Sequence, residues 1–476
     1  MNTTEPKCFH YFYEISKIPR PTYHEEKIAD YVEQFAKDRG LWYQRDALHN
    51  IIIKKPGSTG RENEAPLILQ AHMDMVCVKT AESTHDFSMD PIEIMEVDGW
   101  FRANGTTLGA DDGAGVAYML ALLDEPGLSN PPLECIFTVQ EEDGMGGAKT
   151  IDLSEVHGKR MIGLDGNYEG TTVYTAAAVR ACKYHMDLKM EEAHGNGYVL
   201  NVTGLTSGHG AMLIGSQRAN SIKTVARLLR TVQRSAPIQL KSMQGGGLLH
   251  VIPRDCKVEF YSDLNTEELL AILQPVMEQV KLEYAVSDPN MEITIEATAL
   301  DQSVAVAEAD SERVLRFLHV LPAGASLRHA EDLPRVLGSF NLSILKLDGA
   351  AMECHLVCRS NYPFDVMENR AIAQEYAELF GASCESTQEY AGHSVPLDTP
   401  LTRVWSDVYK ENTGKDLGLL AVHVGLDAGT IFERQKLEDL VVIMPDTWQV
   451  HTTEERMHID GYRRTYEYVK QILARI

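Results

Sequence analysis

Residues 137–147 read FTVQEEDGMGG, an apolar segment that runs directly into two glutamates and then into glycine. The apolar residues 135–139 predict a buried strand, which places Glu141 and Glu142 at its end. Two neighbouring carboxylates at the end of a buried strand are costly unless positive charge meets them. That charge has two candidate sources, basic side chains or a metal ion, and other segments must distinguish between them.

Length and composition limit the class of protein. The chain has 476 residues, too many for one hydrophobic core, which predicts two or three domains. A hydrophobic fraction of 44% with 24% charged residues is typical of a globular chain, and no apolar run is long enough for a membrane span. The first residues lack the basic start and apolar block of a signal peptide, so we expect a cytoplasmic protein.

Net charge and cysteine usage exclude several partners. The formal charge of −25 argues against nucleic acid and anionic membrane, because both repel an acidic chain. This excess fits a solvated acidic surface, and it also fits carboxylates whose bound cations the formal charge does not count. The 8 cysteines match no metal-binding spacing, so we expect reduced thiols.

The first third of the chain alternates between helical and strand patterns, which is typical of an α/β sheet with covered faces. The last stretch, from about residue 388, returns to the same alternation. The expected helices are 23–39, 113–123, 401–411 and 459–476, and the expected strands are 50–53, 67–69, 135–139, 160–164, 419–423 and 440–443.

The middle of the chain, residues 184–387, has longer strands and helices. Its order predicts two successive β-α-β-β-α units, the second of which opens with the strand at 291–298. We therefore predict a catalytic domain with a mixed sheet flanked by helices, built from residues 1–183 and 388–476. An inserted α+β lid domain, residues 184–387, separates these two parts.

Potential metal ligands occur in five separate segments. His72 and Asp74 are two residues apart, and Asp111 and Asp112 lie in a glycine-rich turn. The other three segments contain Glu141 with Glu142, Asp165, and His451. Each has an ordinary explanation, such as a core histidine or a helix N-cap. Together they place histidines and carboxylates at strand ends, where α/β sheets gather their sites. Two histidines and three carboxylates suit two zinc ions that share one carboxylate, with Mn²⁺ or Co²⁺ also suitable.

The order H-x-D, G-x-D-D-G, E-E, D-G and a late histidine resembles the di-zinc metallopeptidase superfamily that contains aminoacylase and the glutamate carboxypeptidases. Within it, the chain is most similar to the aminoacyl-histidine dipeptidase group (peptidase D, Xaa-His dipeptidase). The segments that carry the resemblance are ANGTTLGADDGAGVA, TVQEEDGMGG, GLDGN and GGGLLHVIPRD. The resemblance extends over nearly the whole chain, and the ordered ligand set is highly specific.

The resemblance implies a role for each ligand. Asp111 bridges the two ions and is joined to Asp112 by a cis peptide bond. His72 and Asp165 complete one ion site, and an aspartate at position 165 accompanies aminopeptidase and dipeptidase activity in the family. Glu142 and His451 complete the other site. The catalytic residues implied are Glu141, as the general base, and Asp74, which orients His72.

The resemblance also implies substrate-binding residues in the lid domain. His209 and Asn220 are expected to stabilise the oxyanion, and Arg359 to bind the C-terminal carboxylate of the substrate. An ordinary surface hydrogen bond remains the alternative for each of them. The chain departs from its relatives at His250, and at Asp427, which can still attract a substrate amino group. A doubled lid can supply within one chain what related enzymes share across a dimer, so homodimerisation stays open.

The function expected is hydrolysis of dipeptides of the Xaa-His type (carnosine-like), with broad tolerance, by a zinc-activated water with Glu141 as general base. One alternative is an amidohydrolase that acts on N-acyl-amino acids or short peptides. Another is an inactive metal-binding scaffold, which the presence of every ligand and of Glu141 argues against.

Overall fold

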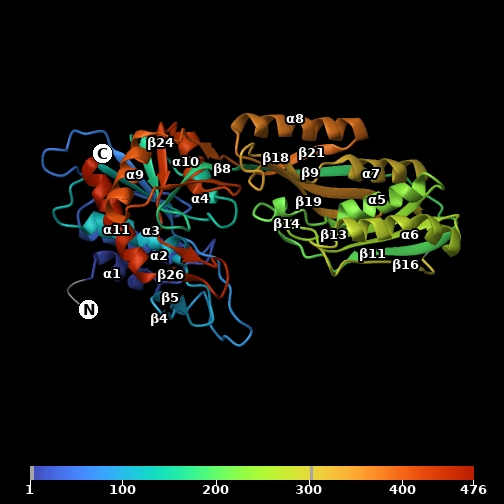
Figure 1. Cartoon of the computed structure of the whole chain (residues 1–476), viewed down its shortest axis with the longest axis horizontal. Helices are drawn as coiled ribbons and strands as arrows, with labels where there is room; N and C mark the ends of the chain where they lie inside the picture. Colours follow the sequence, from blue (N-terminus) through green and yellow to red (C-terminus); the bar gives the residue numbers. More distant parts are fainter. Residues whose placement is uncertain (1–4, 301–303) are drawn as a thin grey trace. The chain divides into compact units, whose positions relative to one another are not determined.

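The computed structural model describes residues 5–300 and 304–476, which divide into two compact units. Unit 1 comprises Met1–Ala176 and Tyr390–Ile476, and unit 2 is the intervening Ala177–Glu389. In Figure 1 the blue N-terminal and red C-terminal elements lie together in unit 1, so the chain leaves this unit and returns to it. The boundaries predicted from the sequence are 183/184 and 387/388, whereas the structural units change at 176/177 and 389/390.

Unit 1 contains the α/β elements expected from the two ends of the chain. Its helices are α1 (Lys7–Ile15), α2 (Glu26–Asp38), α3 (Ala110–Asp124), α4 (Gly146–Thr150), α9 (Pro400–Thr413), α10 (Asp427–Gln435) and α11 (Ile459–Arg475). Its strands are β1 (Trp42–Arg45), β2 (Ile51–Lys55), β3 (Leu67–His72), β4 (Ile94–Val97), β5 (Trp100–Ala103), β6 (Leu133–Thr138), β7 (Arg160–Gly163), β8 (Thr171–Ala176), β22 (His393–Ser394), β23 (Gly418–Val422), β24 (Asp439–Val442), β25 (Thr447–Trp448) and β26 (Arg456–His458).

The main sheet of unit 1 is mixed and has the strand order β1-β2-β6-β3-β7-β24. Strands β6, β3, β7 and β24 are parallel, whereas β1 and β2 are antiparallel to their neighbours. Strands β3 and β6 are fully buried along their length, which explains their nearly continuous apolar sequence. The carboxyl ends of the parallel strands meet at one edge of the sheet, where the predicted ligands lie.

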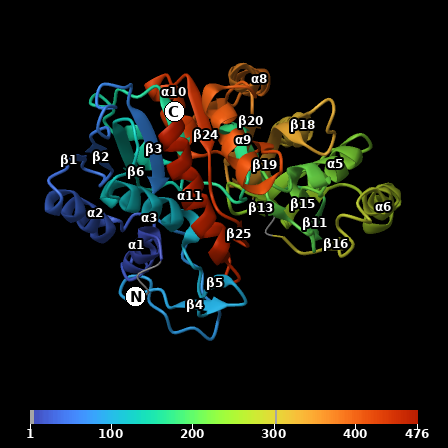
Figure 2. The same ribbon diagram turned by 60° about the vertical axis from the view of Figure 1, so that its left-hand side comes forward.

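One hydrophobic core unites this sheet with five helices, α1, α2, α3, α9 and α11. Helix α3 packs on both α1 and β3, and Figure 2 shows α1, α3 and α11 grouped together. Tyr118 of α3 stacks on Tyr462 of α11 at 4.8 Å between ring centroids, and its hydroxyl donates to the Tyr462 backbone oxygen. The C-terminal helix is thereby held against the helix that begins at the predicted bridging ligand.

Two small sheets complete unit 1 and carry the later candidate residues. The order β25-β26-β5-β4 places the turn with His451 between the strands β25 and β26. The order β22-β8-β23 leads into α10, which packs on α4 and β3 and begins at Asp427.

Unit 2 is an α+β unit. Its helices are α5 (Ser221–Gln233), α6 (Thr266–Glu283), α7 (Glu308–Val320) and α8 (Pro363–Phe380), with the 3-10 helix η1 (Ile214–Ser216). Its strands are β9 (Ala178–Asp187), β10 (Met190–Glu191), β11 (Asn196–Thr203), β12 (Gly208–His209), β13 (Gln239–Gly246), β14 (Val251–Ile252), β15 (Cys256–Ser262), β16 (Glu292–Ala297), β17 (Ala305–Val306), β18 (Gly324–Arg328), β19 (Val336–Asp348), β20 (Ala351–Ser360) and β21 (Ser383–Tyr390).

The large sheet of unit 2 consists of two similar halves. Its order is β16-β11-β15-β13-β19-β20-β9-β21, with β18 paired to β19. The first half is β11-α5-β13-β15-α6-β16, and the second is β9-α7-β19-β20-α8-β21. The strands of each half can be numbered one to four in the order given. From the outer edge of the sheet inward, both halves then have the spatial order four, one, three, two. The two second strands, β13 and β19, pair antiparallel and join the halves.

The halves are nested, so the predicted succession of two units is wrong. Residues 292–297 form β16, which pairs with β11 and closes the first half. The strand that opens the second half is β9, which precedes the first half in sequence and pairs with β20. The first half is therefore inserted between β9 and α7. The insertion follows from the pairing of β9 with β20, two strands that are distant in sequence. The local pattern of residues 178–187 does not indicate which strand β9 pairs with.

The described cysteines and helices agree with two simple expectations. All eight cysteines are free thiols. Among residues 5–300 and 304–476, every helix is too short or too polar to cross a membrane.

Candidate metal centre

The candidate ligands of unit 1 lie at the carboxyl ends of three neighbouring parallel strands. His72 is the last residue of β3, Glu141 and Glu142 follow β6, and Asp165 follows β7. Because these strands are adjacent in the sheet, their ends bring the side chains to one place. Asp111, at the start of α3, and His451, in the turn after β25, approach the same place from other segments.

Asp111 lies between the two histidines. Its Oδ1 is 3.2 Å from His72 Nε2, and its Oδ2 is 3.4 Å from His451 Nε2. Each oxygen of one carboxylate therefore faces a different imidazole, which is the arrangement required of a bridging ligand. The peptide bond between Asp111 and Asp112 is cis, which confirms that prediction.

Among the described residues, three groups of side chains are close enough to hold a metal ion, and the ligand atoms of each group all lie within 4.8 Å of one another. One group is His72, Asp111 and Asp165, and a second is Asp111, Glu142 and His451. These groups are the two sets predicted from the sequence, and Asp111 belongs to both. A third group contains Glu141 with His72 and Glu142, so the proposed general base lies beside the ligands.

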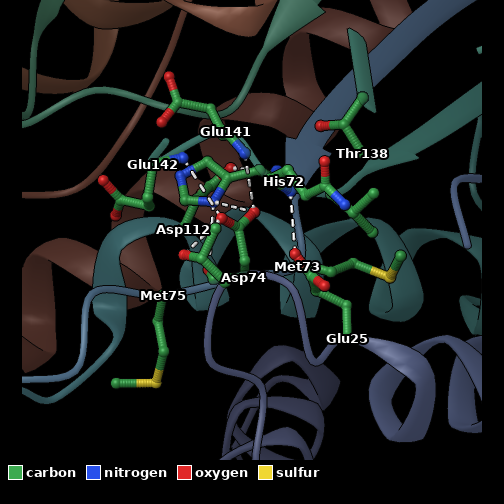
Figure 3. Close-up of polar contacts among 12 residues, drawn as sticks. Glu25, His72, Met73, Asp74, Met75, Asp112, Thr138, Glu141 and Glu142 are labelled. Atoms are coloured by element: carbon green, nitrogen blue, oxygen red, sulfur yellow. Dashed lines mark hydrogen bonds and ion pairs between the residues drawn. The ribbon is translucent and has the colours of Figure 1, made fainter. Parts of the chain in front are cut away.

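Asp74 connects the end of β3 to the loop with the two glutamates (Figure 3). Its carboxylate accepts hydrogen bonds from the backbone N–H groups of Glu141, at 3.1 Å, and Glu142, at 3.2 Å. Its backbone oxygen lies 3.1 Å from His72 Nδ1, whereas its carboxylate Oδ1 is 3.5 Å from the same nitrogen. Asp74 thus contacts His72 more closely through its backbone oxygen than through its carboxylate, and its carboxylate binds the backbone of both glutamates.

Asp112 is buried, and its carboxylate binds backbone groups of β3 and α3. Its carboxylate accepts hydrogen bonds from the backbone N–H groups of His72 and Gly115, both at 3.1 Å. A Cβ atom at Gly115 would lie 2.4 Å from Asp112 Oδ1, so only glycine fits there. The second aspartate of the pair therefore ties the start of α3 to the end of β3.

The backbone is left-handed at Gln140 and at the candidate ligand His451. Gln140, immediately before Glu141, has a φ of 57°, and His451 has a φ of 64°. Such residues carry local strain and persist only where the surrounding structure holds them, as it often does at functional sites.

The electrostatics show that the site contains more carboxylate than its own cations can neutralise. Burial raises the pKa of Glu141 well above its usual range, and burial together with the charge of Asp111 raises the pKa of Asp165 to about 8. Burial also raises the pKa of Glu142, against the effect of His451. Glu142 Oε1 is buried without a hydrogen-bond partner among the described residues.

The pKa values of the two histidines are raised by the neighbouring carboxylates, against the effect of burial. Burial disfavours the charged form of His72, but its hydrogen bonds to Asp111 and Asp74 outweigh this and raise its pKa well above the usual range. At His451, burial is likewise outweighed by Asp111 and Glu142, and the pKa is raised. These side chains hold protons that a divalent cation can replace. The mixture of imidazole and carboxylate ligands fits zinc, or Mn²⁺ or Co²⁺.

Asp427, the predicted partner of a substrate amino group, is fully buried at the start of α10. Burial raises its pKa to about 7. Neither of its oxygens has a hydrogen-bond partner among the described residues. The nearby Thr138 hydroxyl donates its single proton to the Ala71 backbone oxygen at 3.2 Å. Asp427 is therefore a buried carboxylate whose raised pKa the nearby Thr138 hydroxyl only partly offsets, and its substrate-binding role stays a prediction.

The predicted substrate residues of unit 2 have local partners. Asn220 is the N-cap of α5: its oxygen accepts from the N–H groups of Ile222 and Lys223, and its amide donates to the Leu342 oxygen at 2.8 Å. His209 lies in β12, and its Nδ1 accepts backbone N–H groups that follow it. Arg359, in β20, lies with its Nη2 3.0 Å from Nδ1 of His250, a residue where the sequence departs from its relatives.

Sequence reasoning missed two buried charged residues that contact the backbone of the site. Arg20 is 3% exposed and Glu455 is 2% exposed. A weak signal existed for each: Arg20 stands between two prolines, and Glu455 follows His451 by four residues. Neither spacing indicates which backbone groups these side chains bind.

A family model matches residues 68–475, and its description is peptidase family M20/M25/M40. The match extends over most of the chain and includes every predicted ligand. The chain therefore belongs to this peptidase family and is an enzyme, which confirms the resemblance inferred from the motifs.

Individual proteins give the same result along the full length. The chain is 29% identical over 471 residues to the cytosol non-specific dipeptidase of Escherichia coli (strain K12), with 98% of this chain and 96% of that protein covered. The crystal structure of aminoacylhistidine dipeptidase from Vibrio alginolyticus matches with a TM-score of 0.87 at 28% identity, covering 100% of this chain and 98% of that one. An aminopeptidase from Bacillus cereus shares the fold, with a TM-score of 0.55, 16% identity and coverage of 98% and 97%.

Proposed function

We propose that this enzyme hydrolyses dipeptides with a free amino terminus, preferably of the Xaa-His type and with broad tolerance, and that it uses two zinc ions. The observation that carries the proposal is the position of Asp111, whose two oxygens face His72 and His451 separately. Two full-length relatives that are named as dipeptidases support the substrate class.

The ion-binding residues follow from the two groups that share Asp111. His72 and Asp165 would hold one ion, and Glu142 and His451 would hold the other. When bound, such ions supply Lewis acidity and a nucleophilic water at neutral pH. Mn²⁺ and Co²⁺ suit the same ligands.

Glu141 is proposed to act as the general base. It accepts a proton from the attacking water and donates it to the amine that leaves. Burial raises the pKa of Glu141, and a general base works best when its pKa lies near the operating pH. Asp74 supports this role because it fixes the backbone N–H of Glu141.

Substrate recognition is proposed to involve three residues of unit 2 and one of unit 1. Arg359 would bind the C-terminal carboxylate, because guanidinium presents a charged, bidentate donor. His209 and Asn220 would donate hydrogen bonds to the oxyanion, and Asn220 has a second amide N–H besides the one bonded to Leu342. The negative charge of buried Asp427 would favour the substrate ammonium group.

A panel of substrates tests the activity directly. The purified enzyme is stripped with a chelator, reloaded with zinc, and assayed on carnosine-like dipeptides, other unblocked dipeptides and N-acetyl amino acids. We expect hydrolysis of unblocked dipeptides, loss of activity on chelation and recovery on reloading. Faster hydrolysis of N-acetyl amino acids would favour the amidohydrolase instead, and no hydrolysis by metal-loaded protein would favour the inactive scaffold.

We also propose a cytoplasmic location and a catalytic unit that is complete within one chain. The name of the Escherichia coli relative supports the location. The two similar halves of unit 2, joined through β13 and β19, support a lid doubled within one chain. A homodimer remains compatible with this proposal, and sedimentation velocity of active enzyme measures it.

A further inference from the structure

Glu455 binds the backbone of the segment that leads to Asp111. Its Oε2 accepts the N–H groups of Leu108, at 2.8 Å, and Gly109, at 3.0 Å. Its Oε1 accepts those of Ala110, at 2.8 Å, and Asp111, at 3.4 Å. One buried carboxylate therefore holds four consecutive N–H groups, including that of the proposed bridging ligand.

Arg20 binds the same segment from another direction. Its Nη2 donates to the Gly109 backbone oxygen, and its Nη1 donates to the backbone oxygens of Met73 and Asp74, both at 3.0 Å. The guanidinium thus joins the loop after His72 to the loop before Asp111. The carboxylates of Glu455, Asp74 and Asp112 are the negative charges that favour this buried cation.

The glycines of the segment GADDG leave room for this arrangement. A Cβ atom at Gly109 or at Gly113 would lie 2.6 Å from Arg20 Nη2. Gly109 also has a φ of 70°, which favours glycine. The two glycines that flank Ala110, Asp111 and Asp112 are therefore explained by the guanidinium that packs against them.

We propose that Glu455 is a positioning residue for the two-ion centre, and that Arg20 is its partner. Glu455 is four residues beyond His451, so one short segment carries both an ion ligand and the carboxylate that fixes the backbone of Asp111. This linkage sets the two oxygens of Asp111 against their separate histidines. Groups that orient metal ligands in this way affect metal affinity about 10- to 100-fold when they are altered. The inference rests on the proposed two-ion centre.

The test compares Glu455→Gln with the adjacent control Glu454→Gln, because the Glu454 side chain is 72% exposed. Glutamine has the same shape as glutamate but only one acceptor oxygen, so its NH₂ group would face two backbone N–H groups. The metal-free full-length proteins are titrated with Co²⁺, with heat and the visible absorption of the bound ion as readouts. Far-UV circular dichroism and thermal unfolding of the metal-free proteins measure folding separately.

We expect folded Glu455→Gln to bind at least one Co²⁺ ion about 10- to 100-fold more weakly and with an altered spectrum, and Glu454→Gln to match the unaltered chain. A merely structural role would lower the unfolding temperature and leave the affinity and spectrum of the folded protein unchanged, which would overturn the proposal. If Glu455→Gln does not fold, the Co²⁺ affinity and spectrum of Glu455→Asp are judged by the same criteria. Failure of both variants to fold would also overturn the proposal. An unaltered chain that binds fewer than two ions would instead contradict the proposed function.

Discussion

The residues of the candidate metal centre and the substrate-binding residues predicted in unit 2 differ in how their polar atoms are satisfied. In unit 1, Asp111 faces two histidines from distant segments, and Glu142 Oε1 is buried without a partner among the described residues. In unit 2, Asn220 uses its side chain to cap α5 and to bind the Leu342 oxygen.

This difference separates a strong inference from a weaker one. Buried carboxylates that share protons or lack partners are unfavourable without a cation, so the arrangement itself indicates a ligand. A side chain that already satisfies nearby backbone groups has a sufficient structural reason to be present. Substitutions in the two regions can therefore test whether residues of the metal centre affect activity more than the predicted substrate-binding residues of unit 2.

The largest effect is expected from Glu141→Gln. Because the amide cannot accept a proton, turnover should fall about 100- to 10,000-fold, while both metal ions remain bound. Steady-state kinetics and metal analysis of the same preparation provide the measurement. The matched variant Glu142→Gln should instead weaken one ion site. Near-full turnover by Glu141→Gln would contradict the assignment of Glu141 as general base and Glu142 as ion ligand.

Arg359→Ala should have the next largest effect. Loss of a charged hydrogen-bonding partner for the substrate carboxylate should raise KM about 10- to 100-fold, with a smaller effect on dipeptide amides. Comparison of KM for acids and amides is the measurement. Recovery of activity after mixing with Glu141→Ala chains would contradict a catalytic unit complete within one chain.

Metal affinity should depend on pH with a definite sign. The raised pKa values of His72 and His451, caused by Asp111 and its neighbours against the effect of burial, and that of Asp165, about 8, mean that the metal-free site holds protons at neutral pH. Metal must displace them, so affinity should rise with pH by about tenfold per unit for each proton released. Calorimetry in buffers of different ionisation enthalpy counts these protons, and affinity that does not change between about pH 6 and pH 8 would contradict the expectation.

The smallest effect is expected from Asn220. Asn220→Ala should lower the free energy of unfolding by about 1 kcal/mol through loss of the helix cap, whereas Asn220→Ser should retain most of it. Denaturant unfolding compares these variants. If the amide also donates to the oxyanion, both variants should lose kcat to a similar degree. Full activity of Asn220→Ser would leave this residue with a structural role only.

Local patterns predicted most elements because periodicity reports burial within one segment. Residues 459–476 predict a helix that the structure shows as α11, and the strand predicted at 67–69 extends to His72 in β3. The second half of unit 2 was misassigned because β9 pairs with β20, a strand more than 160 residues later. Strand β13 was not predicted, although it joins the two halves through β19.

The sequence by itself determined the family and the order of the candidate ligands, because residue types at strand ends can be recognised in local patterns. Only the tertiary structure decided which side chains hold the backbone of these candidate ligands in place. Asp74 binds the N–H groups of both glutamates, and Glu455 binds the backbone before Asp111 from more than 340 residues away. These are hydrogen bonds between a side chain and a distant backbone. Sequence spacing does not predict such hydrogen bonds, because any backbone N–H group can be the donor.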